Sequence, residues 1–195
     1  MNRQFTFSQY RAIDLSLFAV MLMIFEFLII AATGWFPFEL YTVSVVAAVT
    51  AIVMMRWGPF AAIHAVLGGA VFCLCTGAEP KQYLIYCAGN LLSLLALLLI
   101  KFIGSEKIRS DALLSMVFGF AVQVLMQVGR MCMALLLGHS LSASLGFIAA
   151  DALSIVFTVV IIWIVRHLDG IFENQKHYLL RLQKEREKER GENLE

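Results

Sequence analysis

Six apolar runs of near membrane-spanning length constrain the fold of this chain more than any other feature. A helix needs about 20 mainly apolar residues to cross the hydrocarbon core of a bilayer. The runs cover about residues 13–33, 40–55, 59–76, 82–102, 112–137 and 145–165. Of the 195 residues, 61% are hydrophobic and 15% charged, whereas soluble domains carry about 25% charged residues. The sequence therefore predicts an all-α integral membrane protein, a bundle of six transmembrane helices.

The positive charges predict the orientation of this bundle. With six spans, Lys81 lies on one side, while Lys and Arg side chains gather on the other, where cytoplasmic loops carry them. That group comprises Arg3, Arg11, Arg56, Lys101, Lys107, Arg109, Arg166 and the basic residues of the tail. Both termini are therefore expected in the cytoplasm. The second and third runs are short, and the turn Arg56-Trp57-Gly58-Pro59 between them suggests a hairpin of two shorter helices.

The chain divides by composition into a membrane domain, residues 1–168, and a charged tail, residues 169–195. The helical pattern continues after the last span and ends in alternating charges from Lys184 to Arg190. We interpret the tail as a solvated cytoplasmic helix, and contact with a partner subunit or lipid headgroups is the alternative. The polar N-terminus and the long first run indicate no cleavable signal peptide.

Five polar residues inside the spans are predicted to lie at one depth. Counting from the expected helix ends at 1.5 Å per residue puts all of them roughly 9–15 Å below the outer surface. They are Glu26, Asn90, Gln127, Arg130 and Asp151. Arg130 is the most informative of them, because a charge near the middle of a span costs at least about 2.5 kcal/mol. Such a residue is expected to face a partner, a ligand or water inside the bundle.

Neighbouring residues extend this layer into a candidate binding site. Gln123, Gln127 and Arg130 share one face of the fifth span, and Tyr86 shares a face of the fourth with Asn90. A guanidinium matches a carboxylate or phosphate, and amides can donate or accept. The pattern indicates an outward-facing polar cavity with a cationic centre. The alternative is an internal ion pair, in which Arg130 neutralises Asp151 or Glu26 and locks the helices together.

The first outer loop is rich in aromatic residues, among them Trp35, Phe36 and Tyr41. It is either an aromatic belt at the membrane interface or a flap over the external cavity. Gly68, Gly69 and the alanines before them give the third span a small-residue face, which serves either internal packing or a partner helix.

Several function classes are disfavoured. The chain has no phosphate-binding Gly loop, no His-Glu-x-x-His motif and no Gly-x-Ser-x-Gly elbow. Its net charge of +1 does not indicate the excess of positive charge that is typical of nucleic-acid-binding proteins. The four cysteines lie in apolar segments, and Cys73-x-Cys75 lacks the spacing of a zinc or redox motif. We therefore expect no enzyme activity, no metal site and no cofactor.

Over about residues 8–168 the chain resembles the substrate-binding S components of energy-coupling factor (ECF) transporters. The shared features are six short spans with cytoplasmic ends, an aromatic first outer loop, the Arg56-Trp57-Gly58-Pro59 turn and a Gly/Ala-rich third helix over residues 61–70. The family usually docks through an Ala-x-x-x-Ala-like pattern on its first helix, where this chain has Ala12, Ser16 and Ala19.

The resemblance implies an S subunit of an ABC-type importer in the bacterial plasma membrane. Such a subunit captures a vitamin or related micronutrient outside the cell, and works with a transmembrane coupling protein and two ATPases that hydrolyse the ATP. Carried over, its pocket would include Trp35, Phe36, Tyr41, Asn90, Gln127, Arg130 and Asp151. A structural membrane scaffold of the rod-shape-determining MreD type is the alternative, and a small membrane enzyme is a third interpretation.

Overall fold

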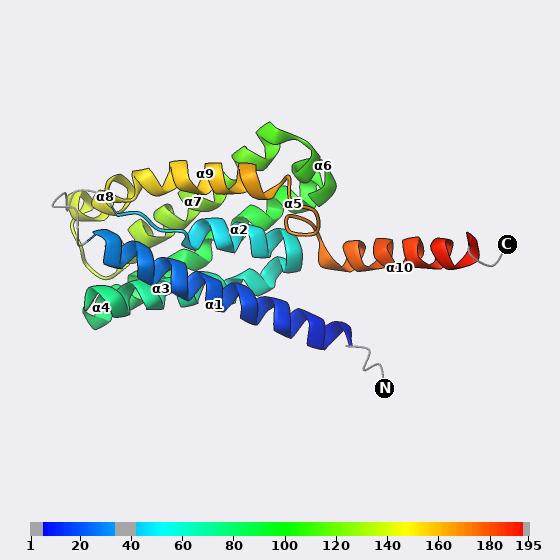
Figure 1. Cartoon of the computed structure of the whole chain (residues 1–195). Helices are drawn as coiled ribbons and strands as arrows, with labels where there is room; N and C mark the ends of the chain where they lie inside the picture. Colours follow the sequence, from blue (N-terminus) through cyan, green and yellow to red (C-terminus); the bar gives the residue numbers. More distant parts are fainter. Residues whose placement is uncertain (1–5, 34–41, 193–195) are drawn as a thin grey trace.

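The computed structural model describes the backbone of residues 6–33 and 42–192, and side chains as far as residue 184. The described residues form helices and no strand, which confirms the all-α prediction (Figure 1). The α-helices are α1 (Phe7–Thr33), α2 (Val46–Trp57), α3 (Ala61–Thr76), α4 (Pro80–Tyr83), α5 (Leu97–Ile103), α6 (Ser105–Ser110), α7 (Ala112–Leu136), α8 (Leu141–Ala150), α9 (Ala152–Val165) and α10 (Gln175–Glu192).

Five helical stretches among the described residues are long and apolar enough to cross a membrane. They cover residues 7–32, 46–76, 80–103, 112–136 and 141–165. The second of them is not straight. A Cβ placed on Gly68 would lie 2.4 Å from a methyl carbon of Val46, although 22 residues of continuous helix would separate the two by ~33 Å. The chain therefore reverses between α2 and α3, at Gly58, whose φ of 60° suits glycine.

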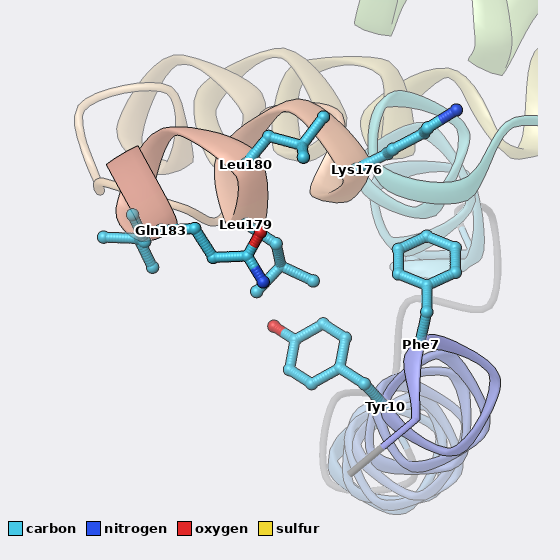
Figure 2. Close-up of a pocket in the computed structure, with 7 residues that line it drawn as sticks. Phe7, Tyr10, Lys176, Leu179, Leu180 and Gln183 are labelled. Carbon is cyan, nitrogen blue, oxygen red and sulfur yellow. The ribbon is translucent and has the colours of Figure 1, made fainter. Parts of the chain in front are cut away.

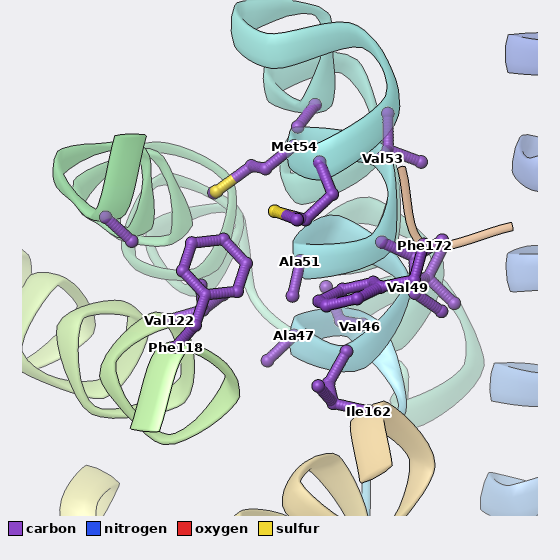
Figure 3. Close-up of a cluster of buried hydrophobic side chains, with 14 of the residues drawn as sticks. Val46, Ala47, Val49, Ala51, Val53, Met54, Phe118, Val122, Ile162 and Phe172 are labelled. Carbon is purple, nitrogen blue, oxygen red and sulfur yellow. The ribbon is translucent and has the colours of Figure 1, made fainter. Parts of the chain in front are cut away.

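Helix α2 forms the centre of the bundle, and all twelve of its residues are buried. It packs against α1, α3, α7 and α9. Small and β-branched side chains of α2 interdigitate with larger ones from its neighbours, as Figure 3 shows for Val46, Ala47, Val49, Ala51, Val53, Met54, Phe118, Val122, Ile162 and Phe172. At 1.5 Å per residue α2 is ~18 Å long, and protein rather than lipid surrounds it.

Glycines let the helices around α2 approach closely. Gly68 faces Val46 of α2, and a Cβ on Gly69 would lie 2.9 Å from the backbone of Tyr86. The small-residue face of α3 therefore serves internal packing, which decides between the two roles that the sequence left open for Gly68 and Gly69.

Two of the predicted spans are interrupted. The stretch predicted over residues 82–102 runs through α4, a π-helical turn (Leu84–Ala88), a 3-10 segment (Leu91–Ala96) and α5. The last predicted span is divided into α8 and α9 at Asp151, whose backbone lies at φ −100° and ψ 12°. Both irregularities lie next to the polar layer described below, and π-helical turns are frequent at functional sites.

The two ends of the bundle differ. At the terminal end, where α1 begins and α10 extends away (Figure 1), Arg56 donates to both carboxylate oxygens of Asp14, at 2.6 and 2.9 Å, and to the carbonyl oxygens of Gly170 and Ile171. The helix predicted to continue after the last span is broken over residues 166–174. Phe172 in this segment and Gln175 at the start of α10 are fully buried, so the segment closes the terminal end.

Candidate functional site

Asp151 connects the polar groups at the opposite end of the bundle, where α8 and α9 meet. It is 3% exposed. Its Oδ2 accepts hydrogen bonds from Arg130 Nη1 at 2.8 Å and Gln123 Nε2 at 3.1 Å. Its Oδ1 accepts from the hydroxyls of Thr42 at 3.3 Å and Ser154 at 2.5 Å. Four donors from three separate segments therefore satisfy this carboxylate inside an apolar bundle, where an unpaired charge would be costly.

Arg130, on α7, is 5% exposed and forms an ion pair with Asp151. Its Nε donates to Asn90 Oδ1 at 2.7 Å, and Asn90 in turn donates through Nδ2 to the carbonyl oxygen of Ala65 at 2.8 Å. The guanidinium carbon lies 4.7 Å from the centre of the Tyr86 ring, a cation–π distance. Among the described residues, no group accepts a hydrogen bond from Arg130 Nη2. The Nη2 group of the guanidinium can therefore donate to another acceptor.

A close helix crossing places Arg130 beside Asn90. A Cβ on Gly89 would lie 2.7 Å from the backbone of Arg130, and one on Gly129 would lie 2.0 Å from the carbonyl oxygen of Gly89. Only a pair of glycines permits this backbone contact. The π-helical turn precedes the crossing, so Tyr86 and Asn90 are both presented to Arg130 from one short segment.

A small pocket opens beside the ion pair, with a volume of about 200 Å³. It is lined by Thr42, Tyr86, Arg130, Ala143, Gly146, Phe147, Ala150 and Asp151. Its residues come from the segment before α2, the π-helical turn, α7 and α8. A cationic and an anionic side chain thus meet an aromatic wall in a cavity at the end of the bundle away from the termini.

No protein-family model, curated protein or solved structure matches this chain. The site is therefore interpreted from its own geometry. Among residues 6–33 and 42–184, no group of three His, Cys, Asp or Glu side chains is placed to hold a metal ion.

The polar layer predicted from the sequence is largely one network. Asn90, Gln123, Arg130 and Asp151 are joined by direct hydrogen bonds. Gln127 donates to the backbone oxygen of Asp151 at 3.0 Å. Tyr86 joins through its ring.

Glu26 is placed differently from the other members of the predicted site. It is fully buried, but its Oε2 accepts from the backbone N–H of Val45 at 3.1 Å, and its Oε1 has no hydrogen-bond partner among the described residues. It makes no ion pair with Arg130 among the described residues. Trp35, Phe36 and Tyr41 lie outside the residues that the structure describes.

The sequence analysis missed three hydroxyl residues of the network. Thr42 and Ser154 donate to Asp151, and Thr158 donates to Gln123 Oε1 at 3.0 Å. Ser154 and Thr158 follow Asp151 by three and seven residues, the spacing of one helix face. That spacing could have identified them, but serine and threonine are common enough in membrane helices to draw little attention. Thr42 has no such signal, because it reaches Asp151 from an extended segment.

Two further cavities have no buried charged side chain in their lining. One, of about 380 Å³, lies at the terminal end between Phe7 and Tyr10 of α1 and residues 176–183 of α10 (Figure 2). The other, of about 440 Å³, follows the close helix crossing and is lined by small and apolar residues from Ala88 to Leu95 and from Gly129 to Met133. Neither contains a buried charged side chain, so the pocket beside Arg130 is the candidate site.

Proposed function

We propose that this protein is the substrate-binding S component of an ECF-type importer, and that it captures a vitamin or related micronutrient outside the cell. In this proposal the chain spans the bacterial plasma membrane six times with both termini in the cytoplasm, counting α2 and α3 as separate spans. The pocket beside Arg130 then faces outward. A transmembrane coupling protein and two ATPase subunits would supply the energy for uptake.

The observation that carries this proposal is the Nη2 group of Arg130, which has no hydrogen-bond acceptor among the described residues. A buried arginine that served only to lock helices would have its donors satisfied by protein groups. Arg130 lines a pocket of about 200 Å³, and its Nη2 has no acceptor in the part of the chain that the structure describes. Asp151 and Asn90 fix its other two nitrogens, so the fork is held in place before a ligand arrives. Such preorganisation reduces the entropic cost of binding.

The charge distribution supports the proposed orientation. Arg56, Arg109, Arg166 and Lys176 lie at the terminal end of the bundle, whereas Lys81, in α4, is at the end where the pocket opens. Positive residues favour the cytoplasmic side, which would put the pocket outside the cell.

A binding assay tests this proposal. Purified protein in lipid nanodiscs is titrated with a panel of labelled water-soluble vitamins, and bound ligand is measured by equilibrium dialysis. We expect saturable binding of at least one compound and its loss in Arg130→Ala. The matched control is Lys81→Ala, which removes a cation at the same end of the bundle without touching the network. The absence of any saturable ligand in the panel, or full binding by a folded Arg130→Ala variant, would refute the proposal.

A structural scaffold of the MreD type is the second candidate, and the Arg130–Asp151 ion pair favours it. That pair joins α7 to the α8–α9 junction, as the Arg56–Asp14 pair joins α2 to α1. For a scaffold, Arg130→Ala would lower stability and leave no ligand-dependent property to lose. Thermal stabilisation of the wild-type protein by a vitamin, absent from Arg130→Ala, separates the two candidates.

A further inference from the structure

We infer that Glu26 is a positioning residue of the candidate site, although it is not among the residues that line the pocket. Its carboxylate holds segment 42–45 to α1, and this segment carries Thr42 to Asp151. This inference rests on the proposed function, because the site that Glu26 positions is the proposed binding site. It makes ligand affinity depend on a residue of the first helix that does not touch the ligand.

The buried start of α2 needs a hydrogen-bond acceptor from outside the helix. The first backbone N–H groups of a helix have no partner within it, and at this helix start Val45 and Val46 are buried. The side chain of Val45, the N-cap residue, makes no capping hydrogen bond. Instead, Glu26 Oε2 accepts from the N–H of Val45 at 3.1 Å, and Ser44 Oγ accepts from that of Val46 at 3.2 Å. A carboxylate is favoured there, because the N-terminal end of a helix is partly positive.

Glu26 reaches this helix start from α1. A second carboxylate of α1, Asp14, binds Arg56 at the C-terminal end of α2. The twelve residues from Asp14 to Glu26 rise ~18 Å along α1, which equals the length of α2. Two carboxylates thus hold α1 to the two ends of α2, and Glu26 is the one at the end where the pocket opens.

The other side of segment 42–45 is attached to the junction of α8 and α9. The N–H of Thr42 donates to the carbonyl oxygen of the last residue of α8 at 2.9 Å, and the N–H of Ser44 donates to Ser154 Oγ at 3.0 Å. The Thr42 hydroxyl donates to Asp151 Oδ1 at 3.3 Å, and Thr42 lines the pocket. The segment therefore bridges α1 and the candidate site.

This bridge is short, so a change at Val45 reaches Thr42. The three residues between the two positions span at most ~10 Å. A buried N–H without an acceptor is unfavourable, so without Glu26 the backbone at Val45 should shift toward another partner. Thr42 would move with it, because its hydrogen bond to Asp151 is already long at 3.3 Å.

Glu26 can be replaced without leaving a buried charge unpaired. Among the described residues it makes no ion pair with Arg130, and its Oε1 has no hydrogen-bond partner. Glu26→Met keeps a side chain of similar length and removes the acceptor for Val45, so the variant should fold. Glu26→Gln keeps an oxygen that can accept from Val45, and should preserve the position of the segment.

Asp111→Ala is the matched control. Asp111 is also a carboxylate that accepts from backbone N–H groups at a helix start, those of Leu113 and Leu114 in α7. It lies at the terminal end of the bundle, away from the pocket (Figure 1). This variant therefore removes the same kind of contact without touching segment 42–45.

The experiment measures amide exchange and ligand affinity in the full-length protein in nanodiscs. Hydrogen–deuterium exchange is followed by mass spectrometry in residues 42–46, and affinity is measured for the vitamin that wild type binds best. Exchange in Glu26→Met should be about tenfold faster than in wild type, as expected for losing a hydrogen bond to a charged group, and affinity should fall about tenfold. Glu26→Gln and Asp111→Ala should stay within about threefold of wild type in both measurements. Circular dichroism and gel filtration verify that each variant folds.

Thr42→Val gives a second test that leaves Glu26 in place. Valine keeps the shape of threonine and removes the hydroxyl that donates to Asp151, so affinity should fall about as far as in Glu26→Met. In the double variant the two losses should not add, because both act through Thr42. Wild-type affinity in Thr42→Val, or losses that add in the double variant, would contradict the inference.

The remaining outcomes separate this inference from the proposed function. Unchanged exchange in Glu26→Met overturns the inference, and so does faster exchange with wild-type affinity, because the segment would then not position the site. Equal losses in Glu26→Gln and Glu26→Met also overturn it, since both keep the length of the side chain and only one keeps the acceptor. In all three cases wild type still binds a vitamin and the proposed function stands. If wild type binds no vitamin saturably, the proposed function fails and this inference fails with it.

Discussion

The Arg130–Asp151 pair should respond unequally to the removal of its two members. In Asp151→Ala, Arg130 keeps one hydrogen-bond acceptor among the described residues, Asn90, and its contact with the Tyr86 ring. In Arg130→Ala, Asp151 keeps three neutral donors, from Thr42, Ser154 and Gln123. After the partner is removed, the Asp151 carboxylate thus keeps more hydrogen bonds than the Arg130 guanidinium does. Asp151→Ala should therefore be the more destabilising substitution.

The loss in the free energy of unfolding depends on which charged group is left without its partner. Breaking a buried ion pair from one side costs about 3–5 kcal/mol, because a charge remains without compensation. That range applies to Asp151→Ala, which also deprives Gln123 Nε2 of its acceptor. Arg130→Ala removes the hydrogen bonds to Asp151 and Asn90 but leaves Asp151 with three neutral donors, so it should cost about 2–3 kcal/mol. The two variants should therefore differ by about 1–2 kcal/mol.

Unfolding by SDS in mixed micelles, followed by tryptophan fluorescence, measures these free energies. A double variant supplies the internal check. Adding Arg130→Met to Asp151→Ala removes the orphaned charge, and should restore part of the stability lost in Asp151→Ala alone. Equal or greater loss in Arg130→Ala than in Asp151→Ala would refute the reasoning, as would a double variant that is no more stable than Asp151→Ala.

Two further predictions concern the fold. Gly129→Ala should lower the free energy of unfolding by at least about 1–3 kcal/mol, because its Cβ would lie 2.0 Å from the carbonyl oxygen of Gly89. The control is Gly146→Ala, whose Cβ would meet open space, and which should unfold like wild type in the same SDS titration. Arg56→Lys should increase hydrogen–deuterium exchange in residues 170–175, because one ammonium cannot reproduce the fork that joins Asp14 to the carbonyl oxygen of Gly170. Unchanged exchange would show that Arg56 does not hold this segment.

The sequence was most informative where a single helix decides the structure. The predicted span over residues 112–137 corresponds to α7, Ala112–Leu136, and Asp111 caps it by accepting from the backbone N–H groups of Leu113 and Leu114. Counting depth along regular helices also brought Asn90, Arg130 and Asp151 into one layer. These inferences need only a constant rise per residue and the cost of placing polar groups in lipid.

The sequence was less informative where contacts between helices override local preference. Asp151 lies among alanines, which favour helix, yet the helix breaks there while its side chain and carbonyl oxygen are held by α7. The π-helical turn at Leu84–Ala88 likewise lies where Gly69 and Gly89 pack against neighbouring backbones. Such features depend on partners far apart in the chain, which hydrophobic periodicity does not reveal.

Two arginines are buried among the described residues, and their hydrogen bonds differ. Arg56 and Arg130 are both 5% exposed and both pair with an aspartate. All three nitrogens of Arg56 donate to protein oxygens, two of them to Asp14 and one to the carbonyls that close the terminal end. Arg130 donates through Nε and Nη1, and among the described residues its Nη2 has no acceptor. Arg130 also lines a pocket. We propose that this unpaired donor of Arg130 is available to a ligand, whereas the Arg56 guanidinium holds the terminal end of the bundle together.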